Sequence, residues 1–290
     1  MSSPADQTAS IRDYYDQNTR LFSRFGSSSK TRSIHRALWL PGVTTLDQAL
    51  NQSNRLVLEA VQRDSEPQRS DPFLFADLGC GIGGTLIYLL QHLPAPARGV
   101  GLTISPLQAR LAHCHLNQAG LSSSGMIVEG DFIHLPLKRR CAAIVSIEAF
   151  VHAVQPARYL SEAARTLQPG GRLVLIDDFL ASVQVPANPA HRRWLSAYRS
   201  GWRLPGLCAV ADLRAWSAGC GLNLLEDHHL TPWLRFRTLP NFLTHFILSA
   251  GARIPLRHAV VPSLLGSLAL QHCLKAGLVE YHLLVFEKQP

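Results

Sequence analysis

The sequence predicts an α/β fold built on a mostly parallel sheet of seven strands. Short apolar runs alternate with helical stretches from about residue 73 to 180, which is typical of successive β–α–β units. A glycine-rich turn, DLGCGIGG at 77–84, follows the first run and opens a helix. Two more strand-like runs, LNLLEDHHL and LVEYHLLVFEK, lie near the end of the chain. The last run is expected to pair antiparallel at one side of the sheet.

The parallel strands are expected in FLFADL, ARGVGLTIS, MIVEGDF, CAAIVSIEA and QPGGRLVLIDDF. Helices are expected between them in TLIYLLQHL, in PLQARLAHCHLNQAG and over about 156–167. Pro106 in the first turn and Gly120 at the end mark the boundaries of the second of these helices.

Residues 1–66 are predicted to form an N-terminal helical lid, and residues 67–290 the main domain. Helices are expected over 11–25, 31–39 and 45–63, with residues 1–10 left without structure. An insertion over about 181–221, which includes the basic stretch HRRWLSAYRSGWR, is expected to cap the C-terminal edge of the sheet.

Composition restricts the class of protein. With 290 residues, 47% hydrophobic and 17% charged, the chain can bury a full core. The net charge of +8 suits an anionic partner, such as nucleic acid, a membrane surface or a phosphorylated small molecule, or serves solubility alone. The six cysteines form no CxxC pair and the polar start MSSPADQTAS is no secretory signal, which indicates reduced thiols and a cytoplasmic protein. No apolar run reaches the ~18–20 residues of a membrane span.

The histidines favour no metal site. Neither His113 and His115 nor His228 and His229 have the i, i+4 spacing of a helical metal face, and no HExxH motif occurs. No metal ligand is therefore expected.

The glycine-rich turn predicts a ligand site. Gly79, Gly81 and Gly83 lack Cβ atoms, so a ligand can approach the backbone there. The helix that follows offers free N–H groups at its N-terminus. The spacing differs from the GxGxxG of dinucleotide folds and no GK[ST] follows, which disfavours ATP bound at a P-loop.

Five segments of the sequence together resemble the motifs of a known enzyme family. DLGCGIGG resembles motif I of class I S-adenosylmethionine-dependent methyltransferases, and GLTISPLQ, GDFIHLPL, IVSIEAFVHA and LQPGGRLVLID follow in the family's order over residues 70–180. The resemblance implies a Rossmann-like fold and S-adenosyl-L-methionine as cofactor. It implies cofactor contacts for the residues Tyr15, Asp77, Gly79, Gly81, Gly83, Thr103, Gln108, Asp131, Phe132 and Ile147.

The resemblance implies different roles for these cofactor-binding residues. Asp77 and the glycines would surround the methionine and ribose, and Asp131 and Phe132 would flank the adenine. Most class I members end their second strand with an acid that holds the ribose hydroxyls. Thr103 stands there in this chain, with Gln108 one turn later. This variant is similar to sterol, tocopherol and cyclopropane-fatty-acid methyltransferases, and Thr103 could equally cap the next helix.

The segment SIEAFVHA at 146–153 resembles the IEAxxHA segment of sterol C-methyltransferases. Such enzymes methylate an alkene and form a carbocation, which a carboxylate can stabilise or deprotonate. Glu148 and His152 are therefore the catalytic candidates. Alternatively, Glu148 holds the cofactor or a backbone amide, with equal weight, and His152 is a structural histidine, which is the favoured reading for that residue.

The acceptor is expected to be a small, apolar molecule with an anionic head, such as a prenyl diphosphate, which could bring Mg²⁺. Residues 228–279 contain arginines but no acid. Substrate contacts are expected from the residues Tyr14, Phe150, Arg192, Arg193, Trp194, Tyr198 and Trp202.

Other readings stay open. One is methylation of a phenolic, quinone or other specialised metabolite, and another is a non-catalytic scaffold. Methylation of RNA or DNA is disfavoured because no NPPY-like or DPPY-like motif follows the fourth strand. Peripheral membrane contact and a homodimer remain options, while a nucleic-acid partner is not expected.

Overall fold

The structure is a computed structural model, and it describes residues 3–25, 35–63, 72–138, 141–184, 186–236 and 260–290. Three of the arginines counted for the acceptor, Arg237, Arg253 and Arg257, lie outside these residues.

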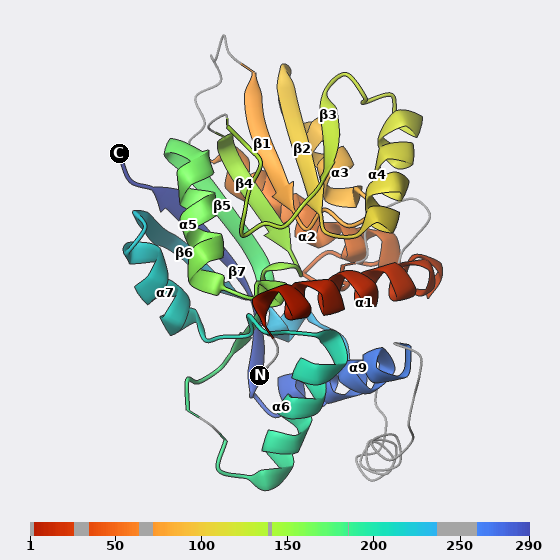
Figure 1. Ribbon diagram of the computed structural model, residues 1–290, viewed down its shortest axis with the longest axis vertical. Helices are drawn as coiled ribbons and strands as arrows, with labels where there is room; N and C mark the ends of the chain where they lie inside the picture. Colours follow the sequence, from red (N-terminus) through yellow and green to blue (C-terminus); the bar gives the residue numbers. More distant parts are fainter. Residues whose placement is uncertain (1–2, 26–34, 64–71, 139–140, 185, 237–259) are drawn as a thin grey trace.

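The central element is a sheet of seven strands in the order β3-β2-β1-β4-β5-β7-β6 (Figure 1). Strands β1 to β5 are parallel, and β7 runs antiparallel to both β5 and β6. This confirms the predicted Rossmann-like sheet with an antiparallel last strand. The strands are β1 (Phe73–Leu78), β2 (Ala97–Thr103), β3 (Gly125–Glu129), β4 (Cys141–Ile147), β5 (Leu167–Leu180), β6 (Leu222–His229) and β7 (Val279–Lys288).

Helices cover both faces of the sheet. On one face, α2 (Leu46–Gln62) and α3 (Gly84–His92) bury Val57 and Leu86 against the strands. On the other face, α5 (Pro156–Thr166) and α7 (Val210–Ala218) bury Leu160 and Leu213. Helix α4 (Pro106–Gln118) begins at Ser105, whose hydroxyl caps the helix by accepting from Gln108 N. This buried scaffold fixes the strand ends at which the site lies.

The N-terminal region differs from the expectation in two places. Helix α1 spans Pro4–Phe25, so it starts inside the stretch expected to lack structure. The reason is a cap in which Asp6 and Ser3 bond each other's backbone N–H groups. The helix expected over 31–39 is wrong in its described part, because residues 35–39 are extended and Leu38 bridges to Leu234.

A cap lies across α1 from the sheet (Figure 1). It consists of α6 (Pro189–Trp202), inside the expected insertion, and α9 (Val260–Lys275), far from it in sequence. The two helices cross at Gly201 and Gly266, where a Cβ on Gly201 would lie 2.5 Å from the Pro262 carbonyl oxygen. Since α7 packs on the sheet, only α6 of the insertion belongs to this cap.

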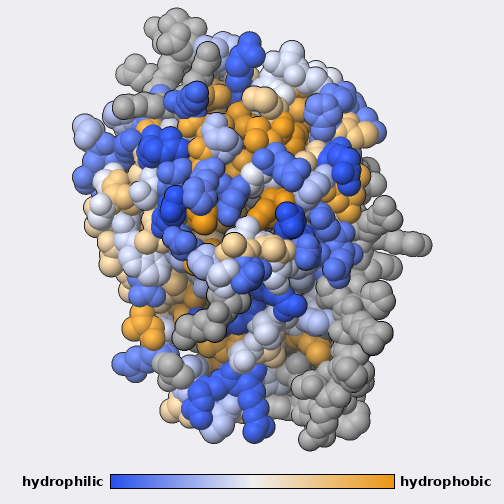
Figure 2. All heavy atoms as spheres, viewed as in Figure 1, coloured by the Kyte–Doolittle hydropathy of each residue, from blue (hydrophilic) through white to orange (hydrophobic). Residues whose placement is uncertain are grey.

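Where the structure describes the chain, the visible surface shows no feature that points to a particular partner. Figure 2 shows hydrophobic and polar residues interspersed on one face, with hydrophobic ones visible over the parallel strands. Within the described residues, no helix combines the length and apolarity needed to cross a bilayer. All six cysteines are free thiols.

Candidate active site

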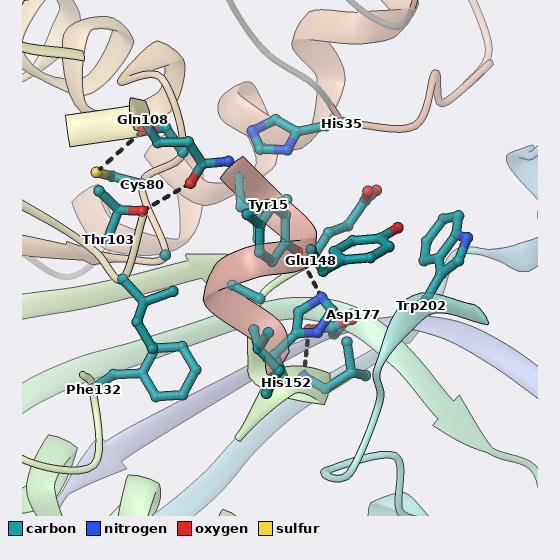
Figure 3. Close-up of a pocket in the computed structure, with 18 of the residues that line it drawn as sticks. Tyr15, His35, Cys80, Thr103, Gln108, Phe132, Glu148, His152, Asp177 and Trp202 are labelled. Carbon is teal, nitrogen blue, oxygen red and sulfur yellow. Dashed lines mark hydrogen bonds between the residues drawn. The ribbon is translucent and has the colours of Figure 1, made fainter. Parts of the chain in front are cut away.

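A pocket opens at the carboxyl ends of β1, β2, β4 and β5, with α1 along one side (Figure 3). Its cavity volume is about 370 Å³, which falls in the range of clefts that bind small molecules. Ligands of open α/β sheets bind at this end of the strands. The glycine turn lines one part of the pocket. The other part is lined by Glu148, by residues of α6 and by the segment that precedes α2.

The glycine turn forms the floor of this part of the pocket, and its Cys80 and Ile82 also contribute to the lining. Gly79 and Gly81 line the pocket with φ values of +80° and +54°, a region that favours glycine. A Cβ on Gly79 would lie 2.3 Å from the Cβ of Ala149, whereas the space beside Gly81 is open. Gly83 lies outside the lining and forms the N-cap of α3 with φ +91°. The open space at Gly81 fits a cofactor that approaches the backbone closely.

Asp77 lies below this floor rather than in the pocket lining. Its carboxyl group is buried, and burial raises its pKa to about 7. The Oδ2 atom has no hydrogen-bond partner among the described residues. A buried polar atom without a partner is costly, and the raised pKa of this carboxyl has the same cause.

Thr103 and Gln108 line the pocket but are already hydrogen-bonded. The Thr103 hydroxyl donates to Gln108 Oε1 at 2.8 Å, and Gln108 Nε2 donates to Thr19 Oγ1 of α1 at 3.2 Å. Asp131 and Phe132 line the same part of the pocket. The structure therefore brings these four cofactor candidates together, with α1 hydrogen-bonded to one of them.

Glu148 lies directly beyond β4 with φ +53°, which is unusual for a residue with a side chain. Its Oε1 atom accepts from Arg36 N at 2.9 Å, Arg36 Nε at 3.1 Å and the Tyr281 hydroxyl at 2.8 Å. Burial raises the pKa of this carboxyl, but the Arg36 guanidinium and these hydrogen bonds outweigh it and hold the pKa below its usual value. Glu148 is thus an ionised carboxylate that lines the pocket.

Arg36 connects Glu148 to a second acid. Its Nη1 atom is 2.7 Å from Asp178 Oδ1, and its guanidinium lies 4.0 Å from the centre of the Tyr281 ring. The Tyr198 hydroxyl donates to the other oxygen of Asp178. The neighbouring Asp177 also lines the pocket. Burial, together with the negative charge of Asp178, raises the pKa of Asp177 well above its usual value.

The hydrogen bonds of His152 fix its protonation. Its Nδ1 atom is 3.0 Å from the Arg203 carbonyl oxygen, which can only accept, so Nδ1 carries the proton. Its Nε2 atom therefore accepts from the Tyr15 hydroxyl at 2.6 Å. Burial lowers the pKa of His152 to about 4, which keeps the ring neutral at neutral pH. His152 thus holds Tyr15 of α1 at the pocket. Ile147, at the end of β4, also lines it.

His35 is a second neutral histidine in the lining. The Thr85 hydroxyl donates to Asn54 Oδ1 at 2.8 Å, so it accepts from His35 Nε2 at 2.9 Å. Among the described residues, Nδ1 of His35 is therefore left with a lone pair that accepts from no donor. Burial lowers the pKa of His35. Neither His35 nor Arg36 was expected at the site from the sequence, because the segment shows no motif or periodicity that would single them out.

The expected substrate residues divide into two groups. Tyr14, Tyr198 and Trp202 line the pocket. The Tyr14 hydroxyl lies 3.0 Å from Ser263 Oγ, and Trp202 Nε1 donates to the Ser263 carbonyl, so both join to α9. Burial raises the pKa of Tyr14 to about 12.

The other four expected substrate residues lie outside the pocket lining. Phe150 is fully buried in the core against Tyr159 and Phe179, because the 3₁₀ turn η1 (Phe150–His152) directs it inward. Trp194 is buried and stacks on His272. Arg192 and Arg193 are exposed, and Arg192 bonds the backbone carbonyls that precede α6. These positions give the four residues no contact with a ligand in the pocket.

Comparison with known proteins agrees with this geometry. Residues 76–175 match the family model described as a methyltransferase domain. The chain is 30% identical over 163 residues to a 24-methylenesterol C-methyltransferase 2 of Oryza sativa subsp. japonica, covering 54% of this chain and 44% of the relative. It is 27% identical over 158 residues to a chloroplastic tocopherol O-methyltransferase of Arabidopsis thaliana, covering 53% and 42%. The chain therefore spans less than half the length of these two curated relatives.

Solved structures share the fold of this chain over almost its whole length. A geranyl diphosphate C-methyltransferase from Streptomyces coelicolor A3(2) superposes with a TM-score of 0.74 at 16% identity, covering 99% of both chains. Identity this low supports the fold only. Residues 76–175 are thus similar to a methyltransferase domain, and the chain shares the fold of this solved methyltransferase.

Proposed function

We propose that this protein is an S-adenosylmethionine-dependent C-methyltransferase that methylates an alkene carbon of an isoprenoid and forms a carbocation on the acceptor. The observation that carries the proposal is Glu148, an ionised carboxylate in the lining of a buried pocket. The names of a sterol C-methyltransferase relative and a geranyl diphosphate C-methyltransferase neighbour support this class of acceptor.

S-adenosylmethionine would supply an electrophilic methyl group on a sulfonium. The residues Gly79, Gly81, Thr103, Gln108, Asp131 and Phe132 would hold it, with Asp77 below the floor. The acceptor's π electrons would form the new C–CH₃ bond with this methyl group as its bond to sulfur breaks, and the adjacent alkene carbon would become cationic. Loss of a proton from a neighbouring carbon then restores an alkene, so that one methyl is gained and one proton is released.

The residues of the chain would act on the cation. Glu148 and Asp178 would place negative charge near the acceptor side, and Arg36 forms an ion pair with each of them and fixes their positions. The aromatic rings of Tyr198 and Trp202 can each add about 0.5–2 kcal/mol of cation–π stabilisation. The closed position of α1, held by Tyr15 and His152, would exclude water that could otherwise trap the cation.

The polar head of the acceptor is a separate question. Among the residues that line the described pocket, Arg36 is the only arginine or lysine, and it is already paired with two acids. Both oxygens of Asp177 and of Asp178 also have hydrogen-bond partners. A Mg²⁺ ion brought by a diphosphate would find Glu148 Oε2 as the uncommitted carboxylate oxygen of these described residues. The described pocket thus favours the apolar part of the acceptor over a diphosphate, which stays an arm of the test.

A second candidate is methylation of a phenolic hydroxyl, as the name of the tocopherol O-methyltransferase relative suggests. One observation favours it: the free Nδ1 atom of neutral His35 faces a site where it could accept a phenolic proton. His152 is less suited to this role, because its Nε2 already accepts from Tyr15.

The test is transfer of an isotope-labelled methyl group from S-adenosylmethionine, with and without Mg²⁺. The acceptors would be geranyl and farnesyl diphosphates, the corresponding alcohols, a sterol alkene, and tocopherol-like phenols, with products identified by mass. A new C–CH₃ bond in an isoprenoid supports the proposal. The relative activity on alcohols and on diphosphates shows which polar head group the acceptor carries. Methylation of phenolic oxygen alone, lost in His35→Ala but kept in Glu148→Gln, would replace it with the second candidate.

A further inference from the structure

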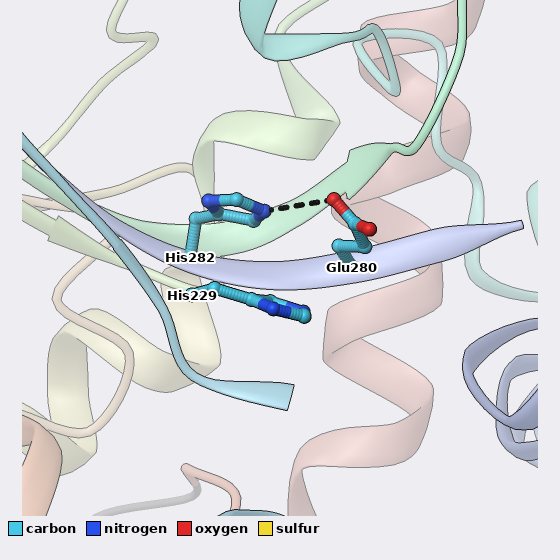
Figure 4. A group of neighbouring side chains, drawn as sticks. All are labelled: His229, Glu280 and His282. Atoms are coloured by element: carbon cyan, nitrogen blue, oxygen red, sulfur yellow. Dashed lines mark hydrogen bonds and ion pairs between the residues drawn. The ribbon is translucent and has the colours of Figure 1, made fainter. Parts of the chain in front are cut away.

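Four polar side chains, Asp227, His229, Glu280 and His282, lie on the β6–β7 strand pair outside the pocket lining. Figure 4 shows three of them, His229, Glu280 and His282. The register places His229 directly opposite His282, and Asp227 and Glu280 lie two residues away on the same face. One ligand atom each of His229, Glu280 and His282 lies within 4.8 Å of the others. We call these four residues the His–carboxylate cluster.

The hydrogen bonds of His282 define which of its nitrogens is available. Its Nδ1 atom is 2.6 Å from Asp227 Oδ1, and its Nε2 atom is 3.1 Å from Glu280 Oε2. An ionised carboxylate only accepts, so Nδ1 carries a proton directed at Asp227. The Nε2 atom, beside Glu280, can then hold either a second proton or a metal ion.

The geometry is compatible with a metal ion. Nitrogen and oxygen ligands lie about 2.0–2.2 Å from Zn²⁺ in proteins, so two ligands of one ion are about 3 Å or slightly more apart, as His282 Nε2 and Glu280 Oε2 are. An Asp that accepts from the far nitrogen of a ligating histidine is the usual support for such a ligand. Asp227 occupies that position.

His229 supplies the third ligand. Its ring lies 5.1 Å from the ring of His282, nearly parallel to it, and its side chain is exposed. Within the described part of the chain, its ring nitrogens have no hydrogen-bond partner. The i, i+4 spacing on which no metal site was expected applies only to helices. On paired strands, side chains that lie next to each other come from opposite positions of the two strands.

We propose that His229, Glu280 and His282 bind one divalent transition-metal ion of the Zn²⁺ type, with Asp227 orienting His282. Two imidazoles and a carboxylate suit such an ion, while Mg²⁺ and Ca²⁺ prefer oxygen ligands only. Because His229 is exposed, water would complete the coordination. The ion would tie edge strand β6 to β7, next to β5, whose Asp177 is opposite His282 in the neighbouring register.

Zinc titration into the full-length protein tests this, followed by calorimetry and by the shift in thermal unfolding temperature. Co²⁺ absorption would report the ligand set. His229→Ala should weaken Zn²⁺ binding at least tenfold and cancel the temperature shift, and Asp227→Asn should weaken binding about 10–100-fold. Since His229 is exposed, its replacement should leave the fold intact.

His228→Ala is the matched control. This histidine is adjacent in sequence but on the other face of β6, bonded to Glu226, so its loss should leave Zn²⁺ affinity unchanged. Equal Zn²⁺ binding by wild type and His229→Ala would place the ion elsewhere, for example at the exposed Cys114 thiol, and overturn the proposal. Failure of the wild type to bind Zn²⁺ would overturn it too.

Discussion

Replacement of Glu148 by glutamine tests the proposed reaction most directly. Glutamine keeps a carbonyl oxygen that can accept the same three hydrogen bonds from Arg36 N, Arg36 Nε and the Tyr281 hydroxyl. The substitution therefore removes mainly the negative charge. Two unit charges 4 Å apart interact by about 4 kcal/mol at an effective dielectric constant near 20. Because Arg36 already offsets part of this field, we expect a loss of about 3–4 kcal/mol, or roughly 10²–10³-fold in kcat.

The assay would follow labelled methyl transfer to the best isoprenoid acceptor, with kcat and KM separated. Cofactor affinity would be measured by calorimetry with S-adenosylhomocysteine, and it should change by about threefold or less. Tyr281→Phe is the matched control, since it removes one hydrogen bond to Glu148 but keeps the charge, so kcat should fall about tenfold or less. An unchanged kcat in Glu148→Gln would refute the electrostatic role. A large loss of cofactor affinity would instead identify Glu148 as a cofactor ligand.

Three more substitutions probe the rest of the pocket. Gly79→Ala should lower both the unfolding temperature and cofactor affinity, because φ is +80° and the new Cβ would meet Ala149 at 2.3 Å; unaltered values of both in scanning calorimetry and cofactor titration would contradict this. Burial lowers the pKa of His152 from 6.5 to about 4, so the unfolded chain binds the proton first as pH falls. The stability from the neutral ring should be complete above about pH 6.5 and decline toward pH 4 by up to about 3 kcal/mol. Denaturant unfolding of His152→Gln should show a flatter pH dependence over that window, and an identical slope would argue against the buried neutral ring. Asp178→Asn leaves Arg36 with one acid instead of two, and should reduce kcat about tenfold or more while KM for the cofactor stays constant; a change confined to that KM would contradict the assignment of Asp178 to the acceptor side.

Local patterns in the sequence were sufficient for the sheet and the glycine turn. The glycine turn follows directly from β1, and both features are encoded within a few neighbouring residues. The acceptor side depends on distant contacts. Arg36 reaches Glu148 across 112 residues of sequence, from an extended segment without periodicity, so no local signal marks it.

The direction in which a side chain points was the second feature that the sequence could not predict. Phe150 and His152 are two residues apart in SIEAFVHA, yet the 3₁₀ turn buries the first in the core and turns the second to the pocket. Sequence spacing alone does not separate these outcomes. Trp194 and Tyr198 show the same problem on α6, since both are fully buried but only Tyr198 lines the pocket.

The position of α1 connects the two halves of the pocket. Its Thr19 bonds Gln108 on the cofactor side, its Tyr15 bonds His152 on the acceptor side, and its Tyr14 lies beside Ser263 of the cap. These contacts are hydrogen bonds between neutral groups, each worth about 0.5–1.5 kcal/mol net. Their sum of a few kcal/mol is enough to keep the helix closed for most of the time and small enough for binding energy to reopen it. Since one helix closes both halves, release of the used cofactor and of the product would require the same movement, which ties turnover to the opening of α1.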